Sequence, residues 1–288
     1  MSFRVRSRII DIINKLNTAK RAAVLSALVE GNSIRYTVRM TGVAKGTVLK
    51  LVVDAGTACA RYLHDNVRNL TSKRVQCDEI WSFVQLKEKQ VPDERKGERG
   101  VGDVWTWVAI DADTKLLISY LVGARDGTHA SHFIADVASR LTNRVQLTTD
   151  GHKPYLEAVE GAFGGEIDYA MLVKLYGNTP GNSAEIRYSP GECIGAEKRP
   201  IVGHPDEAHI STSFAERQNL TMRMRMRRFT RLTNAFSKKI ENHEHSIILY
   251  AMHYNFMRRH QTLRVTPAQA AGVDRHMWSL EEIVGLID

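Results

Sequence analysis

Cysteine is scarce in this chain of 288 residues: only Cys59, Cys77 and Cys193 occur, far apart and without a CxxC pair. Disulfide frameworks and zinc fingers need closely spaced cysteines, so we expect neither, and a reducing cytoplasm is the simplest compartment. Long apolar runs are also missing, since nowhere do about 18 apolar residues follow one another, and we infer no membrane span. Polar residues from Asp11 onward interrupt the basic start of the chain, so no signal peptide is expected.

Positive charge is present and is concentrated at one end. The formal net charge is +8, and 43% hydrophobic content supports a proper core in a chain long enough for about two domains. Residues 1–75 contain 14 Lys and Arg against 4 Asp and Glu, a net of +10, which leaves about −2 for the remainder. Such an excess is typical of a region that neutralises phosphates, although a merely soluble basic domain is the alternative.

Three helices are predicted in the basic front region. Apolar spacing indicates helices at 18–31 and 32–40, and a third follows the glycine-containing turn 41–43. Two helices joined by such a turn are the outline of a helix-turn-helix, and a three-helix bundle without DNA is the alternative. We assign residues 1–70 to this domain and its helical linker. The candidate DNA contacts at the start of the third helix are Lys45, Thr47 and Lys50.

From about residue 75 the apolar period changes and strands alternate with helices. The predicted elements are a strand at 75–84, a hairpin of strands at 104–110 and 116–122, a helix at 129–141, a strand at 145–151, a helix at 153–163, a strand at 170–176 and a late helix after 211–213. This order predicts an α/β fold, a ribonuclease-H-like mixed sheet flanked by helices, preceded by the all-α helix-turn-helix domain. The catalytic domain would span 71–265 with an irregular insertion near 177–210, and 266–288 would form a helical tail.

Three carboxylates stand where this fold would bring distant elements together. Asp78 opens an apolar strand, Asp150 ends another, and Glu216 lies in the opening turns of the late helix, with 72 and 66 residues between successive members. Because no local motif spans such distances, only the fold can make them converge. Each Asp alone could be a simple turn residue, and Asp111, in the hairpin turn, is the main alternative catalytic carboxylate.

The chemistry that needs such a cluster is phosphodiester cleavage. Burying an ionised carboxylate is costly unless a cation compensates it. Two Mg²⁺ ions about 3.5–4 Å apart need hard oxygen ligands to activate the attacking oxygen and stabilise the leaving one. We predict that Asp78 bridges two Mg²⁺ ions, that Asp150 holds one and that Glu216 holds the other, with Mn²⁺ as an alternative ion.

A basic run follows the last of these carboxylates. Between Arg217 and Lys239 there are eight basic residues and no acidic one. Helical spacing from Glu216 predicts that Leu220, Arg223 and Arg227 share one face. A solvated face is the alternative, but alternating Met and Arg favours contact with a DNA backbone. The candidate DNA-binding residues here are Arg223, Arg227, Arg228, Arg231, Lys238 and Lys239.

Several motifs resemble the IS-one-type insertion-sequence transposases of the DDE class. The motifs are Asp78-Glu79-x-Trp81, Thr149-Asp150-Gly151, Thr212-Ser213-Phe214-Ala215-Glu216-Arg217-Gln218-Asn219-Leu220-Thr221-x-Arg223, the segment 228–239, and the tail segments 254–263 and 266–272. The resemblance covers most of the chain from about residue 75, and the segment around Glu216 is its most specific part.

The resemblance implies Mg²⁺-dependent cleavage at the ends of a mobile element and joining of the freed 3′ hydroxyl to a target strand. It implies double-stranded DNA as partner, at least a dimer for synapsis of two ends, and a place at the nucleoid in the cytoplasm of a prokaryotic cell. Family members can carry an N-terminal cysteine zinc finger, which this chain lacks. A non-catalytic DNA-binding protein, such as a repressor or a transposase remnant, and a plain ribonuclease-H-like nuclease are the alternatives.

Overall fold

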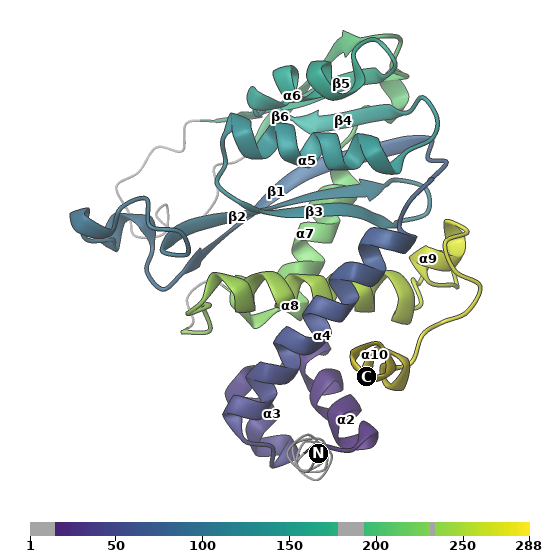
Figure 1. Ribbon diagram of the computed structural model, residues 1–288. Helices are drawn as coiled ribbons and strands as arrows, with labels where there is room; N and C mark the ends of the chain where they lie inside the picture. Colours follow the sequence, from purple (N-terminus) through teal and green to yellow (C-terminus); the bar gives the residue numbers. More distant parts are fainter. Residues whose placement is uncertain (1–14, 178–192, 231–233) are drawn as a thin grey trace, which may run out of the picture.

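A mixed sheet of six strands forms the centre of the molecule (Figure 1). The computed structural model describes residues 15–177, 193–230 and 234–288. The strands are β1 (Arg74–Val84), β2 (Gly102–Asp111), β3 (Leu117–Gly123), β4 (Gln146–Asp150), β5 (Asp168–Tyr176) and β6 (Cys193–Val202), in the order β3-β2-β1-β4-β5-β6. The pairs β1–β2, β2–β3 and β5–β6 are antiparallel, whereas β1–β4 and β4–β5 are parallel. This arrangement is compatible with the predicted ribonuclease-H-like fold.

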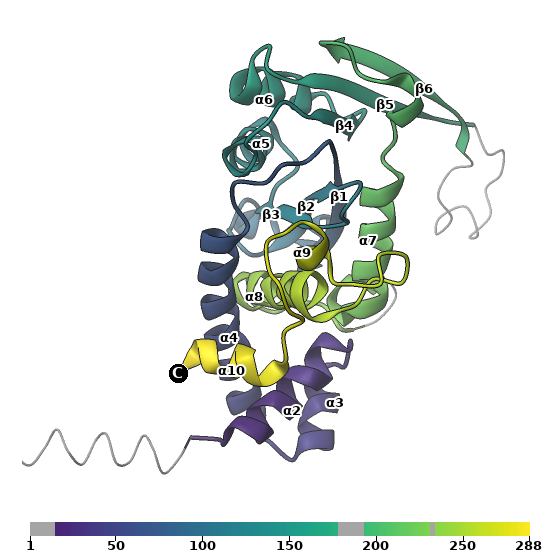
Figure 2. The same ribbon diagram turned by 90° about the vertical axis from the view of Figure 1, so that its right-hand side faces the viewer.

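Helices cover both faces of the sheet (Figure 2). Helices α5 (Gly127–Arg140) and α6 (Pro154–Phe163) lie on one side, and α7 (Ser213–Arg225) lies on the other, against β1 and β2. Helix α8 (Ile240–Met252), continued by the π-helical turn His253–Met257, runs beside α4 below the sheet. Short 3₁₀ turns occupy Glu88–Gln90, Asp93–Arg95, Glu207–His209 and Arg227–Phe229.

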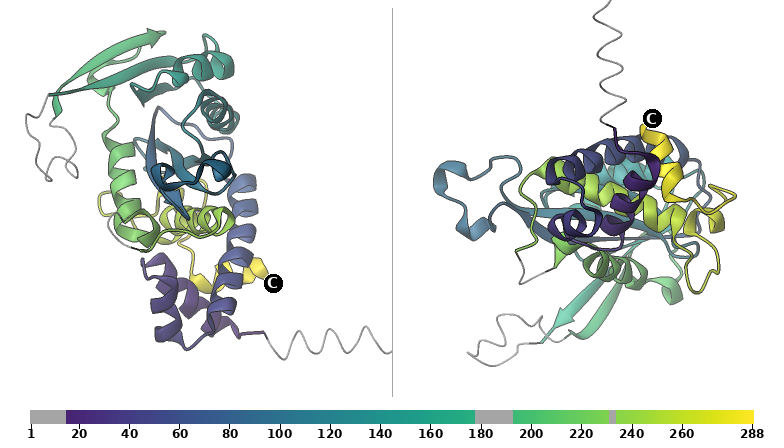
Figure 3. Two further views of the ribbon diagram at one scale, coloured as in Figure 1. Left: turned by 90° about the vertical axis from the view of Figure 1, so that its left-hand side faces the viewer. Right: turned by 90° about the horizontal axis from the view of Figure 1, so that it is seen from below.

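Two pairs of strands extend away from the body of the molecule. Figure 3 shows the β1–β2 hairpin and the β5–β6 ribbon projecting from it. Strand β6 falls in the segment 177–210 that the sequence indicated to be irregular, and that interpretation was wrong for 193–202. Most of its side chains are exposed, and Glu197, Lys198 and Arg199 follow one another. An edge strand without a buried face has no apolar alternation by which to recognise it.

Three helices form the front of the molecule, α2 (Thr18–Val29), α3 (Ile34–Thr41) and α4 (Lys45–Asn66). The predicted third helix and the predicted linker are one continuous helix of 22 residues, which corrects their separation. Gly56 lies in the middle of α4 because α8 crosses closely there: a Cβ atom at position 56 would lie 2.5 Å from the Cβ atom of His245. A single core therefore runs from α2 through the sheet to the C-terminal helix.

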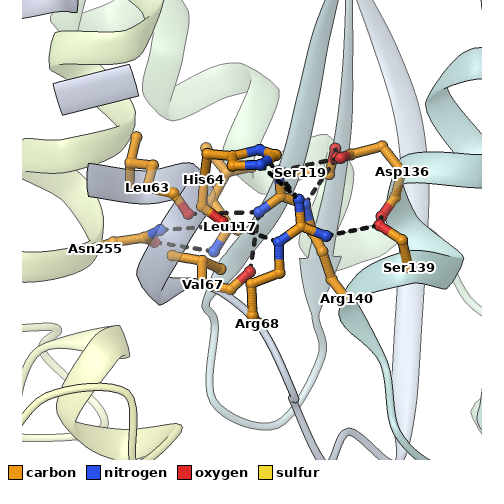
Figure 4. Close-up of polar contacts among 10 residues, drawn as sticks. All are labelled: Leu63, His64, Val67, Arg68, Leu117, Ser119, Asp136, Ser139, Arg140 and Asn255. Carbon is orange, nitrogen blue, oxygen red and sulfur yellow. Dashed lines mark hydrogen bonds and ion pairs between the residues drawn. The ribbon is translucent and has the colours of Figure 1, made fainter. Parts of the chain in front are cut away.

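The carboxyl end of α4 is fixed to α5 by arginine side chains (Figure 4). The Arg140 guanidinium of α5 donates to the carbonyl of Val67 at 2.9 Å and pairs with Asp136 at 2.7 Å. Arg68 donates to the hydroxyl of Ser139 at 3.0 Å. The last carbonyls of a helix have no partner within it, so cationic donors at this end satisfy them. These hydrogen bonds therefore fix the carboxyl end of α4 against α5.

The end of the chain returns to the front helices. Helix α9 (Pro267–Ala270) is followed by α10 (Leu280–Ile287), which packs against α2 and α4 (Figure 1). Ile283 and Val284 are buried in the common core, and Asp288 pairs with Arg21 at 2.8 Å. In the described part of the chain, no helix combines the length and apolar character that crossing a membrane requires.

Candidate functional site

Two of the predicted carboxylates meet where the sheet opens beside β1. In the parallel pair β1–β4, Gln76 lies opposite Thr148, and the same register places Asp78 level with Asp150, the last residue of β4. The pairing of β1 with β4 ends at Gln76, so the side chains that follow on both strands can turn toward one another. The carboxylate oxygens of Asp78, Glu79 and Asp150 lie within 4.8 Å of one another, and we call these three residues the carboxylate cluster.

Asp78 is held at the cluster by two hydrogen bonds. Its Oδ1 accepts from the backbone N–H of Glu79 at 2.9 Å, and its Oδ2 accepts from the side-chain amide of Asn219 on α7 at 2.8 Å. Burial, and after it the negative charge of Asp150, raises the pKa of Asp78 to about 6. No basic side chain among the described residues pairs with Asp78, so its charge is compensated only by these donors.

Glu79 is the member that sequence reasoning missed. Only 7% of the residue is exposed, and burial, followed by the charge of Asp150, raises its pKa to about 8. Glu79 stands beside Asp78 in the motif Asp78-Glu79-x-Trp81, but the sequence analysis gave it no role. The signal that could have found Glu79 is a second carboxylate inside the same apolar strand, which carries the same burial cost.

The cationic side chain of Arg125 contacts two members of the carboxylate cluster. It lies between β3 and α5, and it donates from Nε to Glu79 at 3.1 Å and from a terminal nitrogen to Asp150 at 3.0 Å. Its guanidinium also lies over the ring of Trp105, 5.1 Å from the centroid. One positive charge faces three carboxyl groups, so the ionised cluster keeps a net negative charge.

Glu216 lies beside the cluster rather than within it. Gln76 of β1 accepts from the N–H of Phe214 at 2.7 Å, which places the first turn of α7 on the strand. The carboxylate of Glu216 accepts from the Thr212 hydroxyl and pairs with Lys174 of β5 at 2.7 Å. Burial opposes ionisation, but these hydrogen bonds outweigh it and the pKa of Glu216 is lowered. The charge of Glu216 still contributes to the raised pKa of Asp78, which indicates that the two are near neighbours.

Asp111, the alternative catalytic carboxylate, is a turn residue. It is buried, and its Oδ1 accepts from the N–H groups of Asp113 at 2.7 Å and Thr114 at 2.8 Å. Its Oδ2 accepts from the hydroxyl of Ser72 at 2.5 Å. Oδ1 therefore serves the hairpin turn, as the turn interpretation predicted, and Oδ2 joins the turn to the segment that precedes β1.

The cluster fits a hard divalent cation. All the ligand atoms are carboxylate oxygens, the donors that Mg²⁺ and Mn²⁺ prefer. One further oxygen at the cluster, Oδ1 of Asn219, is buried and has no hydrogen-bond partner among the described residues. A buried acceptor without a partner is costly, and a bound cation or its water would satisfy it.

Basic residues from two distant segments line one cavity of about 720 Å³ between the front helices and the α7–α8 connection. Predicted DNA-binding residues in this lining are Lys45, Arg227, Arg228, Lys238 and Lys239. Among the residues that the structure describes, no Asp or Glu lines the cavity, and we call it the basic cavity. The fold therefore brings the start of α4 and the basic run after Glu216 to one place.

The remaining predicted DNA-binding residues lie elsewhere. Thr47 is exposed on α4, and Lys50 pairs with Asp54 at 2.5 Å on the same helix. Arg223 lies on α7, and Arg231 falls outside the residues that the structure describes.

Two predicted contacts in the basic cavity differ in their surroundings. Helix α7 ends at Arg225, so Arg227 is not on the helical row that begins at Glu216, which corrects that prediction. Arg228 points inward and donates to the Ser237 hydroxyl at 2.7 Å, and burial lowers its pKa to about 10. Arg227 is exposed, whereas Arg228 is part of the cavity wall.

No family model matches the chain, and no curated protein shows significant sequence similarity to it. Among solved structures, the chain is similar to the piggyBac transposase in its synaptic complex with hairpin DNA, with a TM-score of 0.41 and 8% sequence identity. The alignment covers 94% of this chain and 69% of that chain. A likeness this distant carries no argument about function, so the resemblance to IS-one-type transposases rests on the motifs alone.

Proposed function

We propose that the protein is a DNA transposase of the DDE class and IS-one type, which binds the terminal inverted repeats of its insertion sequence and cleaves and joins DNA strands. The observation that carries the proposal is the meeting of Asp78, Glu79 and Asp150 within 4.8 Å, at the open side of β1. Glu216 stands next to them on a helix that leads into a basic run. Asp150 ends β4, and the carboxyl ends of parallel strands are well placed for chemistry.

Each residue has a distinct part in the proposed reaction. Bound divalent ions, Mg²⁺ or Mn²⁺, would activate the attacking oxygen and stabilise the leaving one. Asp78, oriented by Asn219, would bridge the ions, and Asp150 and Glu216 would hold one each. Water would attack first and the freed 3′ hydroxyl second. Arg125 would neutralise the carboxyl groups that it now contacts and orient them.

The front helices would bind the ends of the element. Helices α3 and α4 are joined by a short turn at Gly42, and Thr47 and Lys50 are exposed near the start of α4. These features support a helix-turn-helix in residues 1–70, with catalysis by 71–265 and the tail 266–288 packed on the front helices. Double-stranded DNA would be both end and target, and at least a dimer would hold two ends together.

One observation favours a second candidate, a DNA-binding protein without catalysis. Glu79 and Asp150 pair with Arg125, and Glu216 pairs with Lys174, so three carboxylates have a cation without any metal ion. A protein that only binds DNA could keep these pairs for stability. Asp78, which has no such cation, is the member that this alternative leaves unexplained.

Strand cleavage and joining on a duplex that carries the element's own end, with Mg²⁺, tests the proposal. We expect Glu216→Gln to abolish both products while end binding persists, and Glu241→Gln, at an exposed position on α8, to behave as wild type. Equal products from wild type and Glu216→Gln would contradict the proposed carboxylate set. Binding without products from any of the proteins would favour the non-catalytic alternative, and cleavage without joining would indicate a nuclease.

A further inference from the structure

The basic cavity has a rim of uncompensated positive charge. Its exposed basic side chains are Arg35, Lys45, Arg227, Lys238 and Lys239. None of these five has an ion-pair partner in the part of the chain that the structure describes, whereas Arg225, which also lines the cavity, pairs with Glu30. Side chains of one sign held together without counter-charge attract a polyanion. The rim therefore suits the phosphates of a nucleic acid.

The floor of the basic cavity is apolar and partly aromatic. Leu49 and Val52 of α4, Leu249 and Tyr250 of α8, and Phe236 belong to its lining. Aromatic and apolar surfaces beside basic residues are what proteins use to bind unpaired bases, because every base has a face that can stack. A volume of about 720 Å³ lies in the range of about 300–1,000 Å³ typical of small-ligand sites. It can hold a nucleotide or two but cannot admit a duplex.

The basic cavity lies at the far end of the helix that carries Glu216. Arg225 and Met226 line it where α7 ends. Glu216 and Arg225 are nine positions apart on the helix, about 14 Å at about 1.5 Å per residue. A strand held in the cavity can therefore run along α7 to the carboxylate cluster. Leu220 and Met224 on that helix are 42% and 61% exposed, so part of its surface is open.

The walls of the basic cavity are held together by a direct contact between the front helices and α7. Glu30, at the end of α2, pairs with Arg225, the last residue of α7. The next residue, Gly31, has a φ of +88°, and a Cβ atom there would lie 2.9 Å from the carbonyl oxygen of Arg225. Only glycine allows this approach without strain. The cavity is thus a built junction between the front unit and the catalytic helix.

We propose that the basic cavity binds unpaired nucleotides at a DNA end, with bases against the apolar floor and phosphates on the basic rim. This inference rests on the proposed function for DNA as the substrate, but it adds a site for a single-stranded segment that neither the carboxylates nor the helix-turn-helix requires. A strand separated from its complement would be gripped here while its scissile phosphate lies at the carboxylate cluster.

Binding without cleavage tests the inference. Fluorescence anisotropy in EDTA would compare a duplex that ends in a short single-stranded overhang with a blunt duplex of the same sequence. We expect wild type to prefer the overhang about tenfold, since stacking of a base contributes about 1–3 kcal/mol. Lys238→Gln combined with Lys239→Gln should remove most of this preference and reduce the salt dependence by about two phosphate contacts. The matched control is Lys20→Gln with Lys89→Gln, exposed residues outside the cavity, and should bind as wild type.

A second variant tests the floor without changing charge. Ser246 lines the basic cavity from α8, and Ser246→Trp would fill it. We expect this variant to lose the preference for the overhang and to keep its affinity for the blunt duplex within about twofold. If Ser246→Trp does not fold, photocrosslinking from 5-iodouracil in the overhang to wild type provides the same test, with crosslinks expected at Phe236 or Tyr250. Equal affinity of wild type for both duplexes, or crosslinks only outside the cavity, would overturn the inference.

The failure of this inference and the failure of the proposed function give different results. If wild type cleaves with Mg²⁺ but shows no preference for the overhang, the cavity proposal is wrong and the transposase proposal stands. If wild type prefers the overhang through the cavity but never cleaves, the non-catalytic alternative gains support and the cavity proposal stands.

Discussion

The two ends of α7 carry opposite charge and differ in how that charge is compensated. At the amino end, Arg125 and Lys174 already pair with carboxylates of the site. At the carboxyl end, Lys238 and Lys239 have no ion-pair partner among the described residues. The acidic end is thus partly balanced within the protein, whereas these lysines of the basic end have no counter-charge among the described residues.

This difference determines how each end should respond to its ligand. A divalent ion at the acidic end must share its carboxylates with protein cations, so metal binding has internal competition. A polyanion at the basic end displaces only water and salt ions, so its binding should weaken steeply as salt rises. The predictions below alter one end at a time, beginning with the largest expected effect.

Asp150→Asn should have the largest effect. Loss of a carboxylate from a two-ion site removes several kcal/mol of stabilisation, so we expect strand cleavage to slow about 10³-fold. Single-turnover kinetics on a DNA end would measure it. Asp113→Asn is the matched control, because Asp113 lies in the hairpin turn, where its carboxylate pairs with Arg74 of β1. A cleavage rate in Asp150→Asn similar to that of the control would remove Asp150 from the site.

Arg125→Met should destabilise the acidic end in the absence of metal. Breaking a buried ion pair costs about 3–5 kcal/mol, and we expect the lower value, about 3 kcal/mol, because 33% of the Arg125 side chain is exposed. Urea unfolding at pH 9 would measure the loss, and Mg²⁺ should restore more stability to the variant than to wild type. Arg99→Met, at an 81% exposed side chain, is the control. Equal gains from Mg²⁺ in wild type and Arg125→Met would contradict competition between the two cations.

The same loss should be smaller at pH 5. Burial raises the pKa of Glu79 to about 8, above its ordinary value, so the folded protein binds this proton more tightly than the unfolded chain. Stability contributed by the protonated form is then lost as pH rises toward 8, where the carboxylate depends on Arg125. At pH 5 Glu79 is protonated and uncharged, so removing the guanidinium of Arg125 should cost less stability.

At the basic end, acid should be the destabilising condition. Burial, and then the charge of Arg228, lowers the pKa of His243 to about 3, and His243 accepts or donates hydrogen bonds with Ser82 and Ser237 as a neutral ring. Below pH 6.5 the unfolded chain takes up a proton that the folded protein does not, so stability falls. Between pH 7.5 and 5 this one group should cost about 2 kcal/mol.

His243→Gln isolates that contribution from the other titrating groups. Over the same pH interval, we expect the free energy of unfolding of the variant to fall by about 2 kcal/mol less than that of wild type. Urea unfolding measures both. His132→Gln, at an exposed position on α5, should follow wild type. A variant that loses as much stability in acid as wild type would mean that His243 is protonated in the folded state.

The smallest effect separates two lysines on α4. Lys45 lines the basic cavity, whereas Lys50 pairs with Asp54 at 2.5 Å. Lys45→Gln should weaken binding to a DNA end with an overhang a few fold, and lower the slope of log affinity against log salt by about 1. Lys50→Gln should weaken binding to overhang and blunt duplexes alike, because Lys50 lies outside the cavity, on the proposed helix-turn-helix. A loss in Lys50→Gln that spares the blunt duplex, as in Lys45→Gln, would contradict separate roles for the two lysines.

The elements with an undisturbed apolar period were predictable from the sequence. The strands that carry Asp78 and Asp150 and the helix that carries Glu216 were located within a few residues. For these, the pattern of apolar residues and the punctuation at their ends depend on local chemistry alone. Bringing Asp78 level with Asp150 followed once strands β1 and β4 were taken as neighbours.

The rest depends on contacts between segments far apart in sequence. Arg125 reaches Glu79 and Asp150 from a loop that has no pattern of its own. Gly56 stands within the continuous helix α4 because the side chain of His245 on α8 lies too close for a larger residue there. Neither the contacts of Arg125 nor the contact between Gly56 and His245 can be predicted from the local sequence, because both come from tertiary packing.

Helix α4 also makes chain length and orientation inseparable. It runs unbroken from the front unit to the arginine contacts at Val67, and it is packed along the way at Gly56. Each residue inserted into it would advance the front unit by about 1.5 Å and turn it by about 100° about the helix axis. A change in the length of α4 therefore also rotates the front unit about the helix axis. Only insertions or deletions of about whole helical turns would preserve its orientation.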